Sequence, residues 1–269
     1  MTSLRRPVLV LLLPLLALLV ACGSDDSSSS SGSSDSGGSS ASSTPSPSAS
    51  PSASSGATAA ADGTCTYPQD TRSQVARKVK APPAKPTTTT ATKVTISTNR
   101  GAIPITLDGD KTPCAVNSFL SLAKQGYFDK TPCHRLVDQG IFVLQCGDPS
   151  GTGQQGPGYT LQDELPANDP RLTSCQDQQG AKICIYPPGT IAMAKQGDPS
   201  TGLPAPGTAG SQFFLVYGNT QLPEGYQVIG RMTAAGLQTV KKVAAGGAKP
   251  ADATGNTPPK LATTITSVK

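Results

Sequence analysis

Residues 127–149, which read YFDKTPCHRLVDQGIFVLQCGDP, hold the most informative pattern in this chain. Two short apolar runs, 133–137 and 141–145, are separated by Asp138-Gln139-Gly140. Short apolar runs around a polar, Gly-containing turn predict a β-hairpin. The hairpin would carry Arg135 on its first strand and Gln145 on its second.

Similar patterns extend outward from this hairpin on both sides. Residues 93–98 and 102–107 alternate in polarity around Asn99-Arg100-Gly101, which predicts a second hairpin. Apolar residues in 113–125 recur at helical spacing, with Pro113 near the start and Gly126 after the end. Runs at 190–194, 212–217, 226–231 and 261–268 predict strands, and 234–245 predicts a second helix. Many short strands with two helices are typical of a β-barrel or sandwich with helical caps.

The average composition is too polar for one packed core. The 269 residues are 36% hydrophobic and 4% aromatic, with 28 Gly, 25 Pro and no Trp. Such a composition excludes a multipass membrane protein and a coiled coil. A net charge of +5, part of it at Arg5-Arg6, argues against nucleic-acid binding. The single histidine, His134, excludes a multi-His metal centre, and we expect no metal and no cofactor.

The N-terminal residues account for much of this polarity. Residues 1–21 combine Arg5-Arg6 with an apolar run from Val8, too short to span a membrane and typical of a signal peptide. The run ends in LVAC at 19–22, which resembles the lipobox of bacterial lipoproteins and makes Cys22 the expected lipidation site. An ordinary signal peptide with a chance cysteine and an uncleaved anchor are the alternatives.

Low-complexity sequence follows this segment. Residues 22–61 are dominated by Ser and almost lack large apolar side chains, so they predict a disordered tether. Residues 62–92 form an N-terminal extension that ends in a Pro/Thr-rich linker, and residues 93–269 form the folded domain. We therefore expect an exported protein held by its lipid anchor on the outer face of the cell membrane.

Six further cysteines suggest disulfides in an exported protein, although six cysteines allow 15 pairings. Cys175 and Cys184 flank a polar loop at 176–182 and make a local clip, and Cys133 and Cys146 lie on the two strands of the predicted hairpin. This leaves Cys65 to pair with Cys114. No C-x-x-C motif is present, which argues against a thioredoxin-like redox function.

A series of motifs resembles one known family. In order, these are 127–136, 141–149, GTG at 151–153, GPGY at 156–159, Met193-Ala194, GSQFFL at 210–215, and LP at 222–223 with YQVIG at 226–230. In this order and spacing, residues 93–269 resemble the cyclophilin family of peptidyl-prolyl cis/trans isomerases, in particular its secreted bacterial members. The resemblance implies a mainly β fold, a closed eight-stranded antiparallel β-barrel capped by two α-helices.

The resemblance also implies a set of site residues. It places Arg135 as the catalytic arginine, Gln145 as its support, and Phe142 in the proline pocket. The expected substrate-binding residues are Val143, Ala194, Lys195, Gln212, Phe214, Leu222 and Tyr226. Lys195 is expected to be a solvated residue at the lip of the groove. Gln221 stands where many relatives carry Trp, so we expect weak cyclosporin binding with isomerase activity retained.

These residue types suit the isomerisation of X-Pro bonds. The barrier is about 18–20 kcal/mol because the C–N bond is partly double, and no bond is made or broken. A fixed, permanently charged hydrogen-bond donor is therefore sufficient for catalysis, if it binds the twisted state of the X-Pro bond better than either planar state. We therefore expect an isomerase that acts on proline-containing segments of unfolded or exported proteins as a monomer. The alternative is a non-catalytic prolyl-peptide binding module or adhesin.

Overall fold

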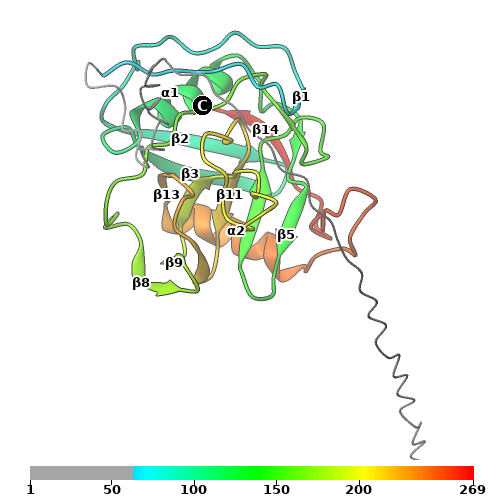
Figure 1. Ribbon diagram of the computed structural model, residues 1–269. Coiled ribbons are helices and arrows are strands. Elements are labelled where there is room, and N and C mark those ends of the chain that lie inside the picture. The colour runs from blue at the N-terminus through cyan, green and yellow to red at the C-terminus, as the bar shows by residue number, and fades with distance from the viewer. Residues whose placement is uncertain (1–62) are drawn as a thin grey trace, which may run out of the picture. The chain divides into compact units, whose positions relative to one another are not determined.

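The structure is a computed structural model, and it describes residues 63–269 (Figure 1). The expected signal peptide at 1–21, Cys22 and the tether at 22–61 lie outside the described residues. The compact unit that contains the described residues extends to Lys269. Within residues 63–269, none of the helices has the length and apolar character that crossing a bilayer requires.

The first predicted hairpin of the domain is confirmed. Strands β2 (Ala91–Thr98) and β3 (Gly101–Asp108) pair along their whole length, from Ala91 opposite Asp108 to Thr98 opposite Gly101. Their alternation buries one face, including Ile96, Ile103, Ile105 and Leu107. Burial of one face fixes the register, because a slip of one residue would expose this apolar set.

The principal sheet has nine strands, all paired antiparallel. Their order is β4 (Thr131–Pro132), β14 (Thr264–Val268), β2, β3, β13 (Val228–Met232), β10 (Thr190–Met193), β11 (Phe213–Val216), β6 (Val143–Cys146) and β5 (Arg135–Val137). Only Cys133 and His134 separate the edge strands β4 and β5 along the chain, so the sheet curls back on itself (Figure 1).

The expected closed eight-stranded barrel is therefore not confirmed in that form. The run 131–137 is divided into two short strands, β4 and β5, and amides of this run donate to the segment 257–263. The Cys133 amide donates to Thr263 O at 2.9 Å, and the Leu136 amide donates to Thr257 O at 2.8 Å. The architecture is a mainly β fold with a curled, nine-stranded sheet and two helices.

Both predicted helices are present, α1 at Pro113–Lys124 and α2 at Ala234–Ala245. Helix α1 contacts β14 and β3, and α2 contacts β3 and β13; Figure 1 shows α1 near the top of the view and α2 near the bottom. The Glu164 carboxylate accepts the Cys114 and Ala115 amides at the start of α1, which satisfies donors that have no partner within a helix. The Thr233 hydroxyl caps α2 by accepting the Gly236 amide.

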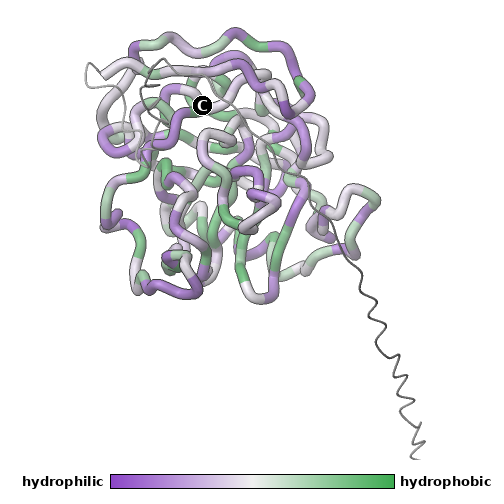
Figure 2. The backbone as a smooth tube through the Cα atoms, viewed as in Figure 1, coloured by the Kyte–Doolittle hydropathy of each residue, from purple (hydrophilic) through white to green (hydrophobic). Residues whose placement is uncertain are grey.

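Two small sheets were not predicted. Strands β12 (Thr220–Pro223), β9 (Ala181–Tyr186) and β8 (Thr173–Gln178) form one, and β1 (Gln74–Val75) pairs in parallel with β7 (Gln155–Gly156) in the other. The expected polar loop at 176–182 is thus a hairpin that turns at Gln179-Gly180, both at positive φ. All six residues of β8 are exposed and all except Cys175 are hydrophilic, so it lacks the alternation that identifies a strand (Figure 2).

The structure contains all three inferred disulfides, Cys65–Cys114, Cys133–Cys146 and Cys175–Cys184. The main core lies between the curled sheet and the helices and includes an aromatic cluster of Phe119, Tyr127, Phe128 and Phe213. A smaller core joins Val143, Phe214 and Val228 to the three-stranded sheet. The second core forms the floor of the candidate site.

Candidate functional site

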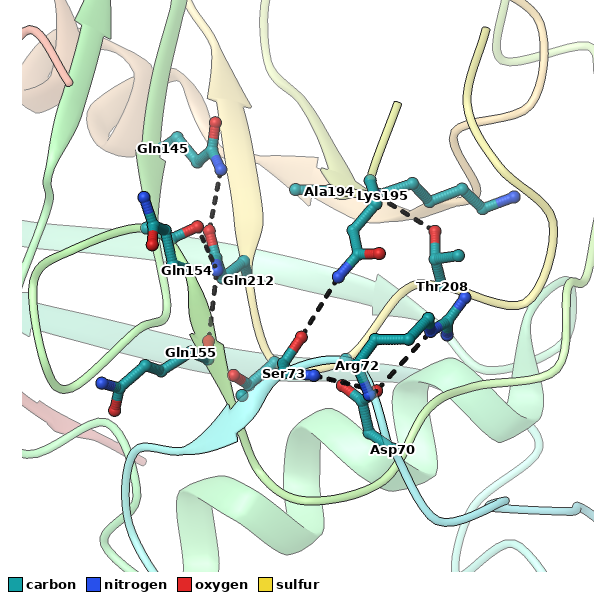
Figure 3. A pocket seen from close by; sticks show the side chains of 15 residues that line it. Asp70, Arg72, Ser73, Gln145, Gln154, Gln155, Ala194, Lys195, Thr208 and Gln212 are labelled. Carbon is teal, nitrogen blue, oxygen red and sulfur yellow. Dashed lines mark hydrogen bonds and ion pairs between the residues drawn. The ribbon is translucent and has the colours of Figure 1, made fainter. Parts of the chain in front are cut away.

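Arg135 and Gln145 lie opposite each other in the register of β5 and β6. Arg135 Nη1 lies 3.5 Å from Gln145 Oε1, and Gln145 Nε2 donates to Gln212 Oε1 at 2.9 Å. Gln212 Nε2 donates in turn to Gly153 O at 2.9 Å and Gln155 O at 3.2 Å (Figure 3). A line of side-chain amides therefore connects the guanidinium to a backbone loop, which limits the positions that Arg135 adopts.

A pocket of about 260 Å³ with both apolar and polar walls adjoins this line of amides, and we call it the Arg135 pocket. It is lined by Arg135, Ile141, Val143, Gln145, Ala194, Lys195, Phe214, Leu222, Tyr226 and Asn256. Val143 and Gln145 are two residues apart on β6 and so share one face. Phe214 lies opposite Gln145 on β11 and packs edge-on against Tyr226 at a centroid distance of 5.4 Å.

Most of the predicted residues meet in one place. Eight of them line the Arg135 pocket, namely Arg135, Gln145, Val143, Ala194, Lys195, Phe214, Leu222 and Tyr226. Gln212 lines a neighbouring pocket and supports Gln145. The amide of Ala194 donates to Gln212 O at 2.9 Å, so this amide is already engaged within the protein.

Phe142, which we expected in the proline pocket, does not line the Arg135 pocket. Its ring packs against Tyr217 at a centroid distance of 5.9 Å and lines a surface hollow with Gly218. Ile141 lines the Arg135 pocket instead. Both residues precede β6, and the Phe142 amide donates to the Thr220 hydroxyl at 3.0 Å, which places Phe142 against β12 and Tyr217.

Lys195 also differs from the prediction, because its side chain is buried and not solvated. Its side chain is 1% exposed, and its Nζ lies 2.7 Å from a carboxylate oxygen of Asp163. Burial lowers the pKa of Lys195, and the Asp163 carboxylate acts in the opposite direction. The ion pair compensates for part of the cost of burying the ammonium group.

Two residues at the site had no sequence signal. Asn256 lines the Arg135 pocket and donates to Thr152 O at 2.6 Å, although it is far from Arg135 in the sequence. His134 is 2% exposed, and neither ring nitrogen has a hydrogen-bond partner. Burial lowers the pKa of His134, so its imidazole stays neutral at pH 7.

The arrangement suits binding and electrostatic stabilisation more than proton or nucleophile chemistry. The nearest cysteines, Cys133 and Cys146, are joined to each other. Burial raises the pKa of Tyr226, so its phenol stays neutral at pH 7. The pocket thus combines apolar side chains with a permanently charged guanidinium at its wall.

Comparisons with known proteins agree with this geometry. The family model described as cyclophilin type peptidyl-prolyl cis-trans isomerase matches residues 93–269. Two relatives named "Probable peptidyl-prolyl cis-trans isomerase B" are 41% identical over 213 residues in Mycobacterium leprae and 42% over 212 residues in Mycobacterium tuberculosis. Both alignments cover 76% of this chain, but only 66% and 63% of the relatives' own lengths.

A solved structure extends the likeness to the fold. The crystal structure of a cyclophilin type peptidyl-prolyl cis-trans isomerase from Cryptosporidium parvum superposes with a TM-score of 0.50 at 28% identity. The superposition covers 66% of this chain and 96% of that one. The curled sheet, the two helices and the match over residues 93–269 lead to one conclusion: the chain belongs to the cyclophilin-type peptidyl-prolyl cis-trans isomerase family.

Proposed function

We propose that this protein is a peptidyl-prolyl cis-trans isomerase in which Arg135 assists rotation about X-Pro bonds. The observation that carries the proposal is the guanidinium of Arg135 at the wall of a small, partly apolar pocket, where Gln145 supports it. The pocket would hold the proline ring while the preceding carbonyl group rotates. Family membership supports the same activity.

The chemistry requires preferential binding of the twisted imide. When the C–N bond twists, resonance is lost and the imide nitrogen becomes pyramidal and able to accept a hydrogen bond. A fixed N–H donor aimed at that nitrogen stabilises the twisted state and neither planar state, which lowers the barrier. Arg135 is always charged, and its support by Gln145 and Gln212 reduces the reorganisation that the donor needs.

An isomerisation assay on a short Ala-Pro peptide tests this proposal. We expect the wild-type protein to accelerate the reaction and the Arg135→Ala variant to lose about 100-fold or more of kcat/KM. Arg231→Ala is a matched control, because Arg231 is exposed on β13 and lines neither the Arg135 pocket nor its neighbour. Peptide binding without acceleration by the wild-type protein would favour a non-catalytic prolyl-peptide binding module.

We also propose that the protein acts on exported proteins while held at the outer face of the cell membrane by a lipid on Cys22. The LVAC sequence at 19–22 and the Ser-rich stretch that follows it support this location. Labelling of producing bacteria with a fatty-acid probe tests it. We expect the wild-type protein to be labelled and Cys22→Ala to be unlabelled, whereas equal labelling would contradict the anchor. We further propose a monomer, which sedimentation tests.

A further inference from the structure

A second pocket adjoins the Arg135 pocket, and part of its wall comes from outside the family match. It has a volume of about 370 Å³ and shares Gln145, Ala194 and Lys195 with the Arg135 pocket. Asp70, Arg72 and Ser73 form one side (Figure 3). These three residues precede residue 93, where the match to the family model begins. We call this cavity the extension pocket.

The extension is attached firmly enough to serve as a wall. The Cys65–Cys114 disulfide joins it to the start of α1, and β1 pairs with β7. Arg77 Nη1 donates to Gly126 O and Tyr127 O, each at 2.7 Å, and Arg77 Nη2 donates to Asp129 O at 3.1 Å. Covalent, backbone and side-chain bonds therefore all hold residues 65–77 against the domain.

The wall also contacts the Gly- and Pro-rich segment 196–209, on the opposite side of the extension pocket. Gln196 Nε2 donates to Ser73 Oγ at 3.1 Å, and Arg72 Nη2 donates to Gly207 O at 3.2 Å. The extension and the segment 196–209 thus meet across the pocket. Both segments are therefore needed to form this part of the pocket.

The charges of the extension pocket favour an acidic ligand. Its charged residues are Asp70, Arg72 and Lys195. Lys195 is buried and paired with Asp163, while the Asp70 side chain is 7% exposed and accepts the amides of Arg72 and Ser73. Arg72 Nε lies 3.6 Å from Asp70 Oδ1 and its Nη2 donates to Gly207 O, but the Arg72 side chain is 45% exposed and far more accessible than the Asp70 carboxylate. Its guanidinium is therefore the charge that a ligand meets.

We propose that Arg72, which the N-terminal extension places in the wall of the extension pocket, makes this cavity a subsite that selects peptides with an acidic side chain near the proline. The proposal rests on the proposed isomerase function, because the same peptide must reach both pockets. An extended chain advances about 3.3 Å per residue, so a side chain two or three residues from the proline would lie about 7–10 Å away. The shared wall of Gln145, Ala194 and Lys195 makes the two cavities contiguous over such a span.

Direct binding tests the subsite independently of turnover. Capped peptides with one proline would carry Glu, Gln or Lys two or three residues before or after it, and their affinities would be measured by calorimetric titration at low salt. At one of these positions we expect the wild-type protein to bind the Glu peptide about threefold more tightly than the Lys peptide, as an exposed charge pair provides. Arg72→Gln should abolish this preference and Arg72→Glu should reverse it.

Arg231→Gln is the matched control, because it removes an exposed arginine outside both pockets and should retain the preference. Thermal unfolding would verify that each variant folds. A wild-type protein that binds the Glu and Lys peptides equally at every position would overturn the subsite, as would a preference that survives Arg72→Gln. Isomerisation of the same peptides separates the two proposals. A charge preference in binding without acceleration of isomerisation contradicts the isomerase and retains the subsite. Acceleration without a charge preference contradicts the subsite and retains the isomerase.

Discussion

Arg135 and Gln145 face each other across two neighbouring antiparallel strands, with Arg135 Nη1 at 3.5 Å from Gln145 Oε1. Backbone pairing of β5 and β6 sets this relationship, and the contact from Gln145 to Gln212 extends it to β11 and the loop at 153–155. The position of the guanidinium therefore depends on strand register and on two amide side chains.

The first prediction concerns Gln145 as a positioning residue. Gln145→Leu removes the acceptor near Arg135 and the donor to Gln212 while keeping a side chain of similar size. We expect kcat/KM on an Ala-Pro peptide to fall about tenfold, with the loss mainly in kcat, because a hydrogen bond to a charged group contributes about 1.5–3 kcal/mol. Gln238→Leu, on the exposed face of α2, is the control. Equal rates for wild type and Gln145→Leu would contradict this role.

The second prediction concerns the disulfide beside the site. Cys133 lies two residues before Arg135, and Cys146 follows Gln145, so the bond ties together the two strands that carry this pair. The double variant Cys133→Ala/Cys146→Ala should lose about 2–4 kcal/mol of unfolding free energy and several-fold of kcat/KM.

Removal of Cys65–Cys114 provides the comparison for that experiment, since this disulfide lies outside the Arg135 pocket. The double variant Cys65→Ala/Cys114→Ala should lose a similar amount of stability but keep its rate on a short Ala-Pro peptide. Urea unfolding and the isomerisation assay measure the two quantities. If both double variants lose activity equally, the effect is one of general stability and not of Arg135 placement.

The third prediction concerns pH. Burial lowers the pKa of His134, and Arg135 lowers it further, whereas Asp148 and Asp252 raise it. In the unfolded chain a histidine binds its proton near pH 6.5, so between the two pKa values the unfolded state binds more protons. The free energy of unfolding should therefore decrease as the pH falls below about 6.5, by at most about 1.4 kcal/mol per pH unit from this group.

Urea unfolding of wild type and His134→Gln at pH 7.5 and 5.5 measures this contribution of His134 to the free energy of unfolding. Between pH 7.5 and pH 5.5, the free energy of unfolding should fall more for the wild-type protein than for His134→Gln. This comparison does not depend on how the two proteins differ at pH 7.5. Other titrating groups, such as Glu164, contribute to both proteins and cancel in the comparison. A difference that is the same at both pH values would show that His134 binds its proton equally in the folded and unfolded states.

The fourth prediction concerns cyclosporin. Gln221 is exposed on β12 next to Leu222, which lines the Arg135 pocket. We expect weak cyclosporin binding by the wild-type protein, and binding about tenfold or more tighter by Gln221→Trp, because a partly buried Trp adds a large apolar contact. Fluorescence or calorimetric titration measures the affinity, and Gln221→Ala is the control. Tight binding by the wild-type protein would be inconsistent with this role for Gln221.

Local patterns predicted much of the fold. The alternation in 93–107 predicted β2 and β3, and the helical spacing in 113–125 and 234–245 predicted α1 and α2, because a side of each element must be buried. Strand β8 was missed since its six residues are exposed and its pairing comes from β9. The sequence did not show that Ile141 and not Phe142 lines the Arg135 pocket, because the order of residues does not specify which of two neighbours turns into a pocket.

By itself, the sequence determined the family, the two helices and the hairpin that carries Arg135 and Gln145, since periodicity, turn residues and motif order are local properties. Only the tertiary structure decided that Lys195 is buried against Asp163, that Asn256 joins the site, and that Arg72 faces the extension pocket. These relationships join residues far apart in the chain. They depend on how the sheet curls and how the extension packs, which no local pattern encodes.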